Sequence, residues 1–168
     1  YKDDKAVNGN NTYKVVAEYN GKMGIDATQT IWAGFDIPEP VKNLKLRTID
    51  GNMHVKLTWE APEKGENDGY FNINDISYTV WRSLDKKNFS PIANNIKDLT
   101  YIDTSIEEEV QDMQEVYYYA VTADNQAGRS KGVTQFIGVG KPYIFPVAES
   151  FPNGRLELNP WSYKNVQG

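Results

Sequence analysis

The side chain best suited to acid–base or metal chemistry is His54, the only histidine among the 168 residues. An imidazole can act as a general base or as a metal ligand near neutral pH. The chain has no cysteine, and no Ser/Asp partner motif lies near His54. In a strand pattern His54 faces away from Trp59, so we interpret it as an exposed strand residue and expect no catalytic residue.

Two groups of carboxylates could offer the several oxygen ligands that calcium takes. They comprise Glu107, Glu108, Glu109 and Asp112 in one group, and Glu63, Glu66, Asp68 and Asp75 in the other. Neither group has the D-x-[DN]-x-[DN]-G spacing of a calcium-binding loop. Paired carboxylates for glycoside hydrolysis would also need a cleft. We therefore expect solvated acidic loops, with no metal and no cofactor.

The composition limits the classes of partner. The net charge of −5 argues against nucleic acid, because phosphate binding needs a basic surface. The lack of cysteine excludes disulfides, Cys-ligated zinc and thiol nucleophiles. No apolar run approaches the length of a membrane span, so we expect no membrane insertion. The first residue is Tyr1 rather than Met, and we expect a fragment or a processed product.

Strands must position these side chains, because alternating apolar and polar residues dominate the chain. Val55, Leu57 and Trp59 form the apolar face of one such segment. Further strands are predicted at 76–82, 89–93, 100–103, 116–123 and 134–139. Turn residues separate these segments, and this spacing predicts a β-sandwich. Pro38-Glu39-Pro40 is predicted to be a linker, because proline stiffens the chain.

The segment 116–123 contains three consecutive tyrosines, which strand alternation separates. Tyr117 and Tyr119 share a face with Val121, and we predict that this face is buried. The residues that should pack near it are Trp59, Tyr78 and Val80. Tyr118 lies on the opposite face, so it is the one tyrosine of the three that is left to meet a partner.

The sequence also contains an internal repeat. Residues 12–24 (TYKVVAEYNGKMG) resemble residues 116–128 (VYYYAVTADNQAG), and residues 27–34 (ATQTIWAG) resemble residues 133–140 (VTQFIGVG). The same hairpin is therefore predicted twice, and the first copy lacks the strands that should precede it.

The first hairpin needs a cover, because two strands alone cannot bury an apolar face. Its apolar residues are Tyr13, Val15, Ala17 and Ile31. We expect them to pack on the complete module, on the tail that begins at Pro142, or on a second chain.

These segments together resemble a fibronectin type III domain, and residues 38–139 cover a whole module. The motif residues are Trp59 and Pro62, Thr100-Tyr101-Ile102-Asp103, and Tyr117, Ala123, Asn125 and Gly128. The resemblance implies an all-β, immunoglobulin-like β-sandwich of seven strands, with partial β segments on either side and no active site of its own. It makes Trp59, Tyr78, Tyr101 and Tyr117 structural residues. Tyr117 would occupy the tyrosine-corner position, with its hydroxyl bonded to nearby backbone.

In this fold the third and sixth strands are neighbours, which places Trp81 and Tyr118 on the outer face of one sheet. They could form an exposed aromatic pair that stacks on a sugar or contacts a protein. The alternative, which we favour, is a cross-strand pair that stabilises the sheet by about 0.2–1 kcal/mol. For the alternative in which this face meets a partner, Trp81 and Tyr118 are the candidate contact residues.

The resemblance divides the chain into three parts. Residues 1–37 would be the C-terminal hairpin of a preceding module, and residues 38–141 the complete module. Residues 142–168 would be a linker and the start of a following domain, and they resemble the opening of jelly-roll adhesin-like domains in surface proteins of Bacteroidetes-type bacteria. Trp32 and Trp161 could pack at the joints between these parts.

The predicted function is that of a non-catalytic module in a secreted or cell-surface bacterial protein, exposed outside the outer membrane. It would space neighbouring domains of the same polypeptide and could contact a host or cell-surface protein or glycan. The alternative is an accessory module of a secreted carbohydrate-active enzyme or peptidase, with the catalytic domain outside this chain.

Overall fold

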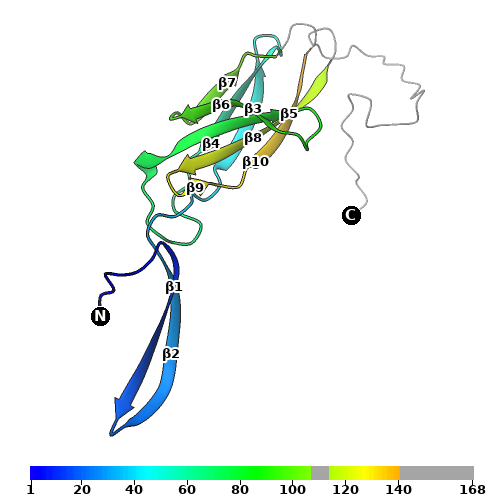
Figure 1. The fold of residues 1–168 in the computed structure, drawn as a ribbon. Helices are drawn as coiled ribbons and strands as arrows, with labels where there is room; N and C mark the ends of the chain where they lie inside the picture. The colour runs from blue at the N-terminus through cyan, green and yellow to red at the C-terminus, as the bar shows by residue number, and fades with distance from the viewer. Residues whose placement is uncertain (107–113, 141–168) are drawn as a thin grey trace, which may run out of the picture.

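The computed structural model describes residues 1–106 and 114–140, and it shows a sandwich of two β-sheets with a hairpin at one end (Figure 1). The first sheet has the order β3-β4-β7, with β3 at Lys42–Ile49, β4 at His54–Glu60 and β7 at Thr100–Asp103. The second sheet has the order β10-β8-β5-β6. Its strands are β5 (Ser77–Ser83), β6 (Ser90–Ile96), β8 (Glu115–Asn125) and β10 (Val133–Val139), and the short β9 (Gly128–Arg129) pairs with β8.

The prediction of an all-β, immunoglobulin-like sandwich is confirmed: seven main strands form its two sheets, and β9 adds two residues. A single 3₁₀ turn, η1 (Ile73–Asp75), is the only helical element among the described residues. No helix in this part of the chain has the length and apolar character needed to cross a membrane. The acidic segment 107–113 and the tail 141–168 lie outside the described residues.

The core forms because the strands direct one set of side chains inward, as in β4, where buried Val55, Leu57 and Trp59 alternate with less buried polar residues. The side chains that the two sheets bury between them include Val55, Leu57, Trp59, Tyr78, Val80, Tyr117, Tyr119, Val121 and Ala123. Strand register brings the inward residues into line, since Tyr78 pairs with Ala123 and Val80 with Val121. Burial of this apolar surface is the main term that stabilises the sandwich.

The entry and exit of the chain lie at opposite ends of the sandwich. The entering segment 34–40 contacts the long loop that follows β4, through a hydrogen bond from Asp36 N–H to Tyr70 O of 3.0 Å. The chain leaves β10 at Gly140, whose N–H donates to Asn52 O at 2.9 Å in the turn that precedes β4. These two connections flank β4, so they mark its two ends (Figure 1).

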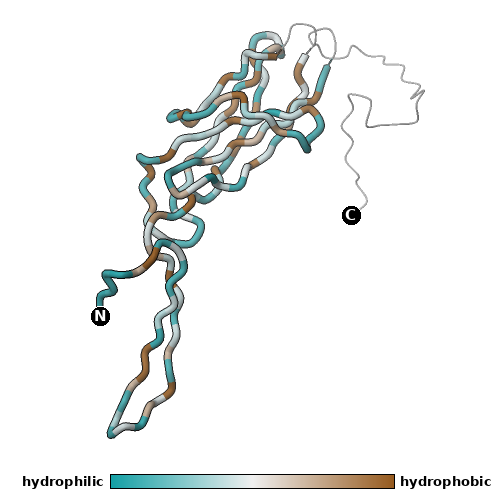
Figure 2. Tube along the Cα trace, viewed as in Figure 1, coloured by the Kyte–Doolittle hydropathy of each residue, from teal (hydrophilic) through white to brown (hydrophobic). Residues whose placement is uncertain are grey.

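The N-terminal hairpin projects from the entry end (Figure 1). It consists of β1 (Gly9–Tyr19) and β2 (Lys22–Ala33), joined by a two-residue turn at Asn20 and Gly21. Both turn residues have positive φ angles, 49° and 71°, which suits the tight turns that match the twist of a hairpin. Figure 2 shows hydrophobic positions along this hairpin as well as in the sandwich.

The expected cover of the hairpin is not provided by the module. Val15 and Ile25 expose 70% and 97% of their surface, and Ile31 is also exposed. The expectation that the module covers them is wrong, because the joint directs the hairpin away from the sandwich. The tail that was the second proposed cover lies outside the described residues.

Candidate functional site

The outer face of the β10-β8-β5-β6 sheet carries both candidate contact residues. Trp81 on β5 lies opposite Ala120 and is half-buried. Its indole N–H donates to Thr122 Oγ1 at 3.2 Å. The guanidinium of Arg129 lies 4.8 Å from the centroid of the Trp81 ring and also bonds to Asp124 Oδ1 at 2.6 Å. This cation–π contact covers one ring face, so Trp81 offers a partner less aromatic surface than the sequence suggested.

Tyr118 does not pair with Trp81, so that prediction is wrong. The register places Tyr118 opposite Ser83 on one side and Phe136 on the other. The rings of Tyr118 and Phe136 lie 5.9 Å apart at an angle of 44°, and Phe136 is 55% exposed. The aromatic pair on this sheet face is therefore half-buried Tyr118 with exposed Phe136, and Phe136 was not predicted as a contact residue. Its position at an outward site of β10 was the available signal.

The residues predicted to be structural lie in or beside the core. Trp59 and Tyr78 are buried, with ring centroids 5.4 Å apart in an edge-on arrangement, and Tyr101 is partly buried against the hydrophobic core. Tyr117 is buried as well, but its hydroxyl donates to Glu115 Oε2 at 3.0 Å rather than to backbone. The prediction of a hydrogen bond to backbone is therefore wrong. Glu115 lies two residues earlier on the same face of β8, so its carboxylate accepts the hydrogen bond of the hydroxyl instead.

A buried polar network joins the two sheets at the exit end. Asp103 on β7 is fully buried and accepts hydrogen bonds from Arg82 Nη1 at 2.9 Å and from the Tyr119 hydroxyl at 2.7 Å, both on the other sheet. The N–H and the hydroxyl of Ser105 bond to its second oxygen. Burial alone would raise the pKa of Asp103, but these hydrogen bonds and the Arg82 charge outweigh it and lower that pKa. Burial raises the pKa of Tyr119, and the bond to Asp103 adds to the effect.

The other polar candidates have local partners. His54 Nδ1 lies 3.0 Å from Asp50 Oδ2, at the start of β4. The carboxylates of the long loop are bonded separately: Glu63 to Lys42, Glu66 to Lys131, Asp68 to Lys64 and Asp75 to Asn72. Within residues 1–106 and 114–140, no three His, Cys, Asp or Glu side chains lie together in a way that could hold a metal ion. Glu107, Glu108, Glu109 and Asp112 lie outside the described residues.

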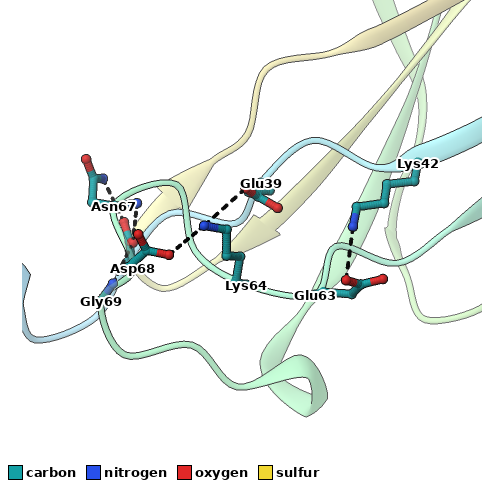
Figure 3. Close-up of polar contacts among 8 residues, drawn as sticks. Glu39, Lys42, Glu63, Lys64, Asn67, Asp68 and Gly69 are labelled. Carbon is teal, nitrogen blue, oxygen red and sulfur yellow. Dashed lines mark hydrogen bonds and ion pairs between the residues drawn. The ribbon is translucent and has the colours of Figure 1, made fainter.

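The predicted linker is held against the sandwich by the long loop after β4. We call this region the joint, made of residues 34–39, 63–70 and 125–128. In Figure 3, Lys64 lies between Glu39 and Asp68, with Nζ···O distances of 3.9 and 2.5 Å, and Lys42 bonds to Glu63 at 3.2 Å. Because these side chains are largely exposed, the ion pairs contribute little stability.

The residue at the centre of the joint is Asp36, which was not predicted from the sequence. It is fully buried, and its carboxylate accepts hydrogen bonds from the N–H groups of Asn67 and Gly69, two residues that are labelled in Figure 3. The available signal was the Asn67-Asp68-Gly69 turn sequence in an unusually long loop. Trp32 lies at the joint, where its indole N–H donates to Phe35 O at 3.1 Å.

The comparisons with solved structures fit this geometry. The FN1–FN3 domains of chicken CNTN1 align with a TM-score of 0.50 and 15% identity, over 84% of this chain and 46% of that one. The chain has a fibronectin type III fold. A Fn3-like protein from Clostridium thermocellum aligns over 65% of this chain and its own full length, with 22% identity and a TM-score of 0.48. No family model matches the sequence, and no curated protein matches it.

A fibronectin type III fold explains the division of roles among the tyrosines. Tyr117 and Tyr119 lie between the sheets, and Tyr118 lies outside. The fold itself fixes no activity, so function has to be argued from the surfaces and from the ends of the module.

Proposed function

We propose that this fibronectin type III module is a non-catalytic spacer, in line between neighbouring parts of a longer polypeptide. The observation that carries the proposal is that the chain enters at the joint and leaves at Gly140 at the other end. A module with attachments at opposite ends separates its neighbours by its own length. A module with both attachments at one end would not.

The interior supports a steric role. Leu57, Val80 and Tyr119 are among the fully buried side chains that fill the space between the sheets. Protein cores of this kind are close-packed and resist deformation, so the module can act as a solid unit of constant length.

The repeat supports a second part of the proposal, namely that β1 and β2 are the last two strands of a preceding module. Their pattern matches β8 and β10, whose apolar face is covered by the β3-β4-β7 sheet. In that preceding module, the strands equivalent to β3, β4 and β7 would cover Val15 and Ile25. We also propose that the longer protein lies outside the cytoplasm, at the bacterial cell surface or in secreted form.

Distances between spin labels test the in-line arrangement. The chain has no cysteine of its own, so labels can be attached to introduced cysteines only. Thr28→Cys labels the hairpin, Gln126→Cys labels the joint end and Lys87→Cys labels the turn after β5 at the exit end, all at exposed positions. The 28–87 distance should clearly exceed the 126–87 distance. If the hairpin folds back and the two distances are equal, the spacer proposal fails.

A second candidate function, contact with a partner, is favoured by the Tyr118–Phe136 ring pair, in which Phe136 is the exposed ring. Aromatic rings are common anchors for sugars and for proteins. On a glycan array or a panel of surface proteins, Phe136→Ala should abolish binding, and Thr134→Ala on the same face of β10 should leave it intact. Binding that survives Phe136→Ala would remove this candidate.

A further inference from the structure

The segment that enters the module, residues 34–39, here called the linker, is bonded along its length to the loop after β4. Tyr70 N–H donates to Gly34 O at 2.8 Å, and Asp36 N–H donates to Tyr70 O at 3.0 Å. Farther along, Glu66 N–H donates to Ile37 O at 2.9 Å and Glu39 N–H to Lys64 O at 3.1 Å. Backbone groups on both sides of Asp36 are therefore paired, which removes the freedom that a linker of this length would otherwise have.

Asp36 fills the centre of this contact. Its Oδ2 accepts the N–H groups of Asn67 at 2.6 Å and Gly69 at 3.0 Å, and its Oδ1 accepts Asn67 Nδ2 at 2.9 Å. Its own carbonyl accepts Asn125 Nδ2 at 2.8 Å, which ties the linker to the turn after β8. A buried carboxylate without such donors would strongly destabilise the fold. Burial of Asp36 therefore favours the loop conformation whose N–H groups donate to its carboxylate.

Close packing completes the joint. A Cβ built on Gly65 would lie 2.4 Å from Asp36 Oδ2, and one built on Gly69 would lie 2.2 Å from Trp32 Cδ1. On the other side, Ile37 lies 3.3 Å from the Cβ position of Gly128. Phe35 and Tyr70 pack edge to face with centroids 5.2 Å apart. The loop therefore contacts both the linker and Trp32, which belongs to β2 of the hairpin.

We propose that residues 63–70 and 125–128 form a docking surface for the linker and for the base of the preceding part of the same chain. The buried carboxylate of Asp36 fixes this contact, and the contact holds the hairpin at one angle to the sandwich. This inference rests on the proposed spacer function and adds to it that the spacing is rigid in direction as well as in length.

The experiment measures the distribution of distances between spin labels at Thr28→Cys in the hairpin and Thr134→Cys on β10, both exposed positions. In the otherwise unchanged chain we expect a single narrow distribution. Asp36→Ala should at least double its width, because the donors of the loop lose their acceptor. Asp36→Asn, which keeps one oxygen acceptor, should give an intermediate width.

Asp75→Asn is the matched control, since it changes an exposed carboxylate of the same loop that bonds to Asn72 and lies outside residues 63–70. It should leave the distribution unchanged. Circular dichroism and thermal melting confirm that each variant keeps the sandwich, whose core does not include Asp36. Gly69→Ala is a second variant, and it should shift the distribution because its Cβ displaces Trp32.

Two results would overturn the inference: a broad distribution in the unchanged chain, or a narrow one in Asp36→Ala. Neither result would affect the spacer proposal, which depends on the mean 28–87 distance exceeding the 126–87 distance. Conversely, a hairpin locked back along the sandwich would give a narrow distribution with a short mean distance, and only the spacer proposal would fail.

Discussion

The two hairpins of this chain have closely similar sequence patterns and opposite environments. In β8–β10 the inward face is covered by the β3-β4-β7 sheet, and Tyr119 has no exposed surface. In β1–β2 the equivalent position is Val15, which is 70% exposed. An alternating pattern thus specifies which residues share a face, but burial depends on whether another sheet is available to cover that face.

The registers of the two hairpins show why a shorter connection does not change which residues share a face of the hairpin. Tyr117 pairs with Ile137 in β8–β10, whereas its counterpart Tyr13 pairs with Gln29, two residues before the counterpart of Ile137. The connection in the first hairpin is two residues shorter, and the register shifts by two. Because side chains alternate with period two, an even shift leaves the apolar residues on one face.

Truncating the matched inward residues should give the largest difference between the hairpins. Tyr119→Ala should cost about 3–5 kcal/mol of unfolding free energy, because it empties a buried site and leaves Asp103 short of a donor. Val15→Ala should change it by less than about 0.5 kcal/mol. Urea denaturation of both variants measures this, and a comparable loss for Val15→Ala would mean that the first hairpin is covered.

Hydrogen exchange compares the backbone of the two hairpins directly. Amides of β1–β2 should open with a free energy about 3 kcal/mol lower than those of β8–β10, since few buried contacts resist local opening there. Exchange rates read by nuclear magnetic resonance should therefore differ roughly 100-fold. Equal protection would show that the first hairpin is part of a cooperative unit.

Acid should weaken the sandwich through Asp103, which has no counterpart in the first hairpin. Its pKa is lowered in the folded state, so its stabilising contribution is present above the ordinary Asp pKa and is lost as the pH falls through the lower folded value. Asp103→Asn should cost about 2 kcal/mol at neutral pH and flatten the acid side of the stability profile. Melting curves between pH 7 and pH 2 test this, and an unchanged acid slope in the variant would contradict it.

The smallest effect is expected on the outer faces. Phe136→Ala removes the ring that contacts Tyr118 and should cost about 0.5–1 kcal/mol. Its counterpart Thr30→Ala loses only an exposed hydroxyl contact with Thr12, of 2.8 Å, and should be near neutral. Thermal melts of the pair would show whether the outer face of the sheet contributes more than the outer face of the free hairpin.

Much of the fold follows from local pattern. The Val55, Leu57 and Trp59 row predicts β4, and the alternation of Tyr117, Tyr118 and Tyr119 predicts which faces of β8 lie inside. The pairing of Trp81 with Tyr118 failed because it depends on register between strands far apart in sequence. That register places Ser83, and not Trp81, opposite Tyr118.

The joint could not be predicted for a related reason. Asp36 bonds to residues about thirty positions away, and their N–H groups converge only once the loop has folded. Composition marks such a loop as a turn region but does not give its conformation. By contrast, the hydrogen bond between Tyr117 and Glu115 could have been predicted from the sequence, because residues two apart in a strand share a face.

The position of Trp32 gives the joint an optical property. Its Cδ1 lies 2.2 Å from the position that a Cβ on Gly69 would take, and its N–H donates to Phe35 O, so docking holds the ring against the module. Release of the linker would hydrate that ring and shift its emission to longer wavelength. The chain therefore contains its own fluorophore at the joint between the hairpin and the sandwich, and a Trp32→Phe variant would identify that component of the spectrum.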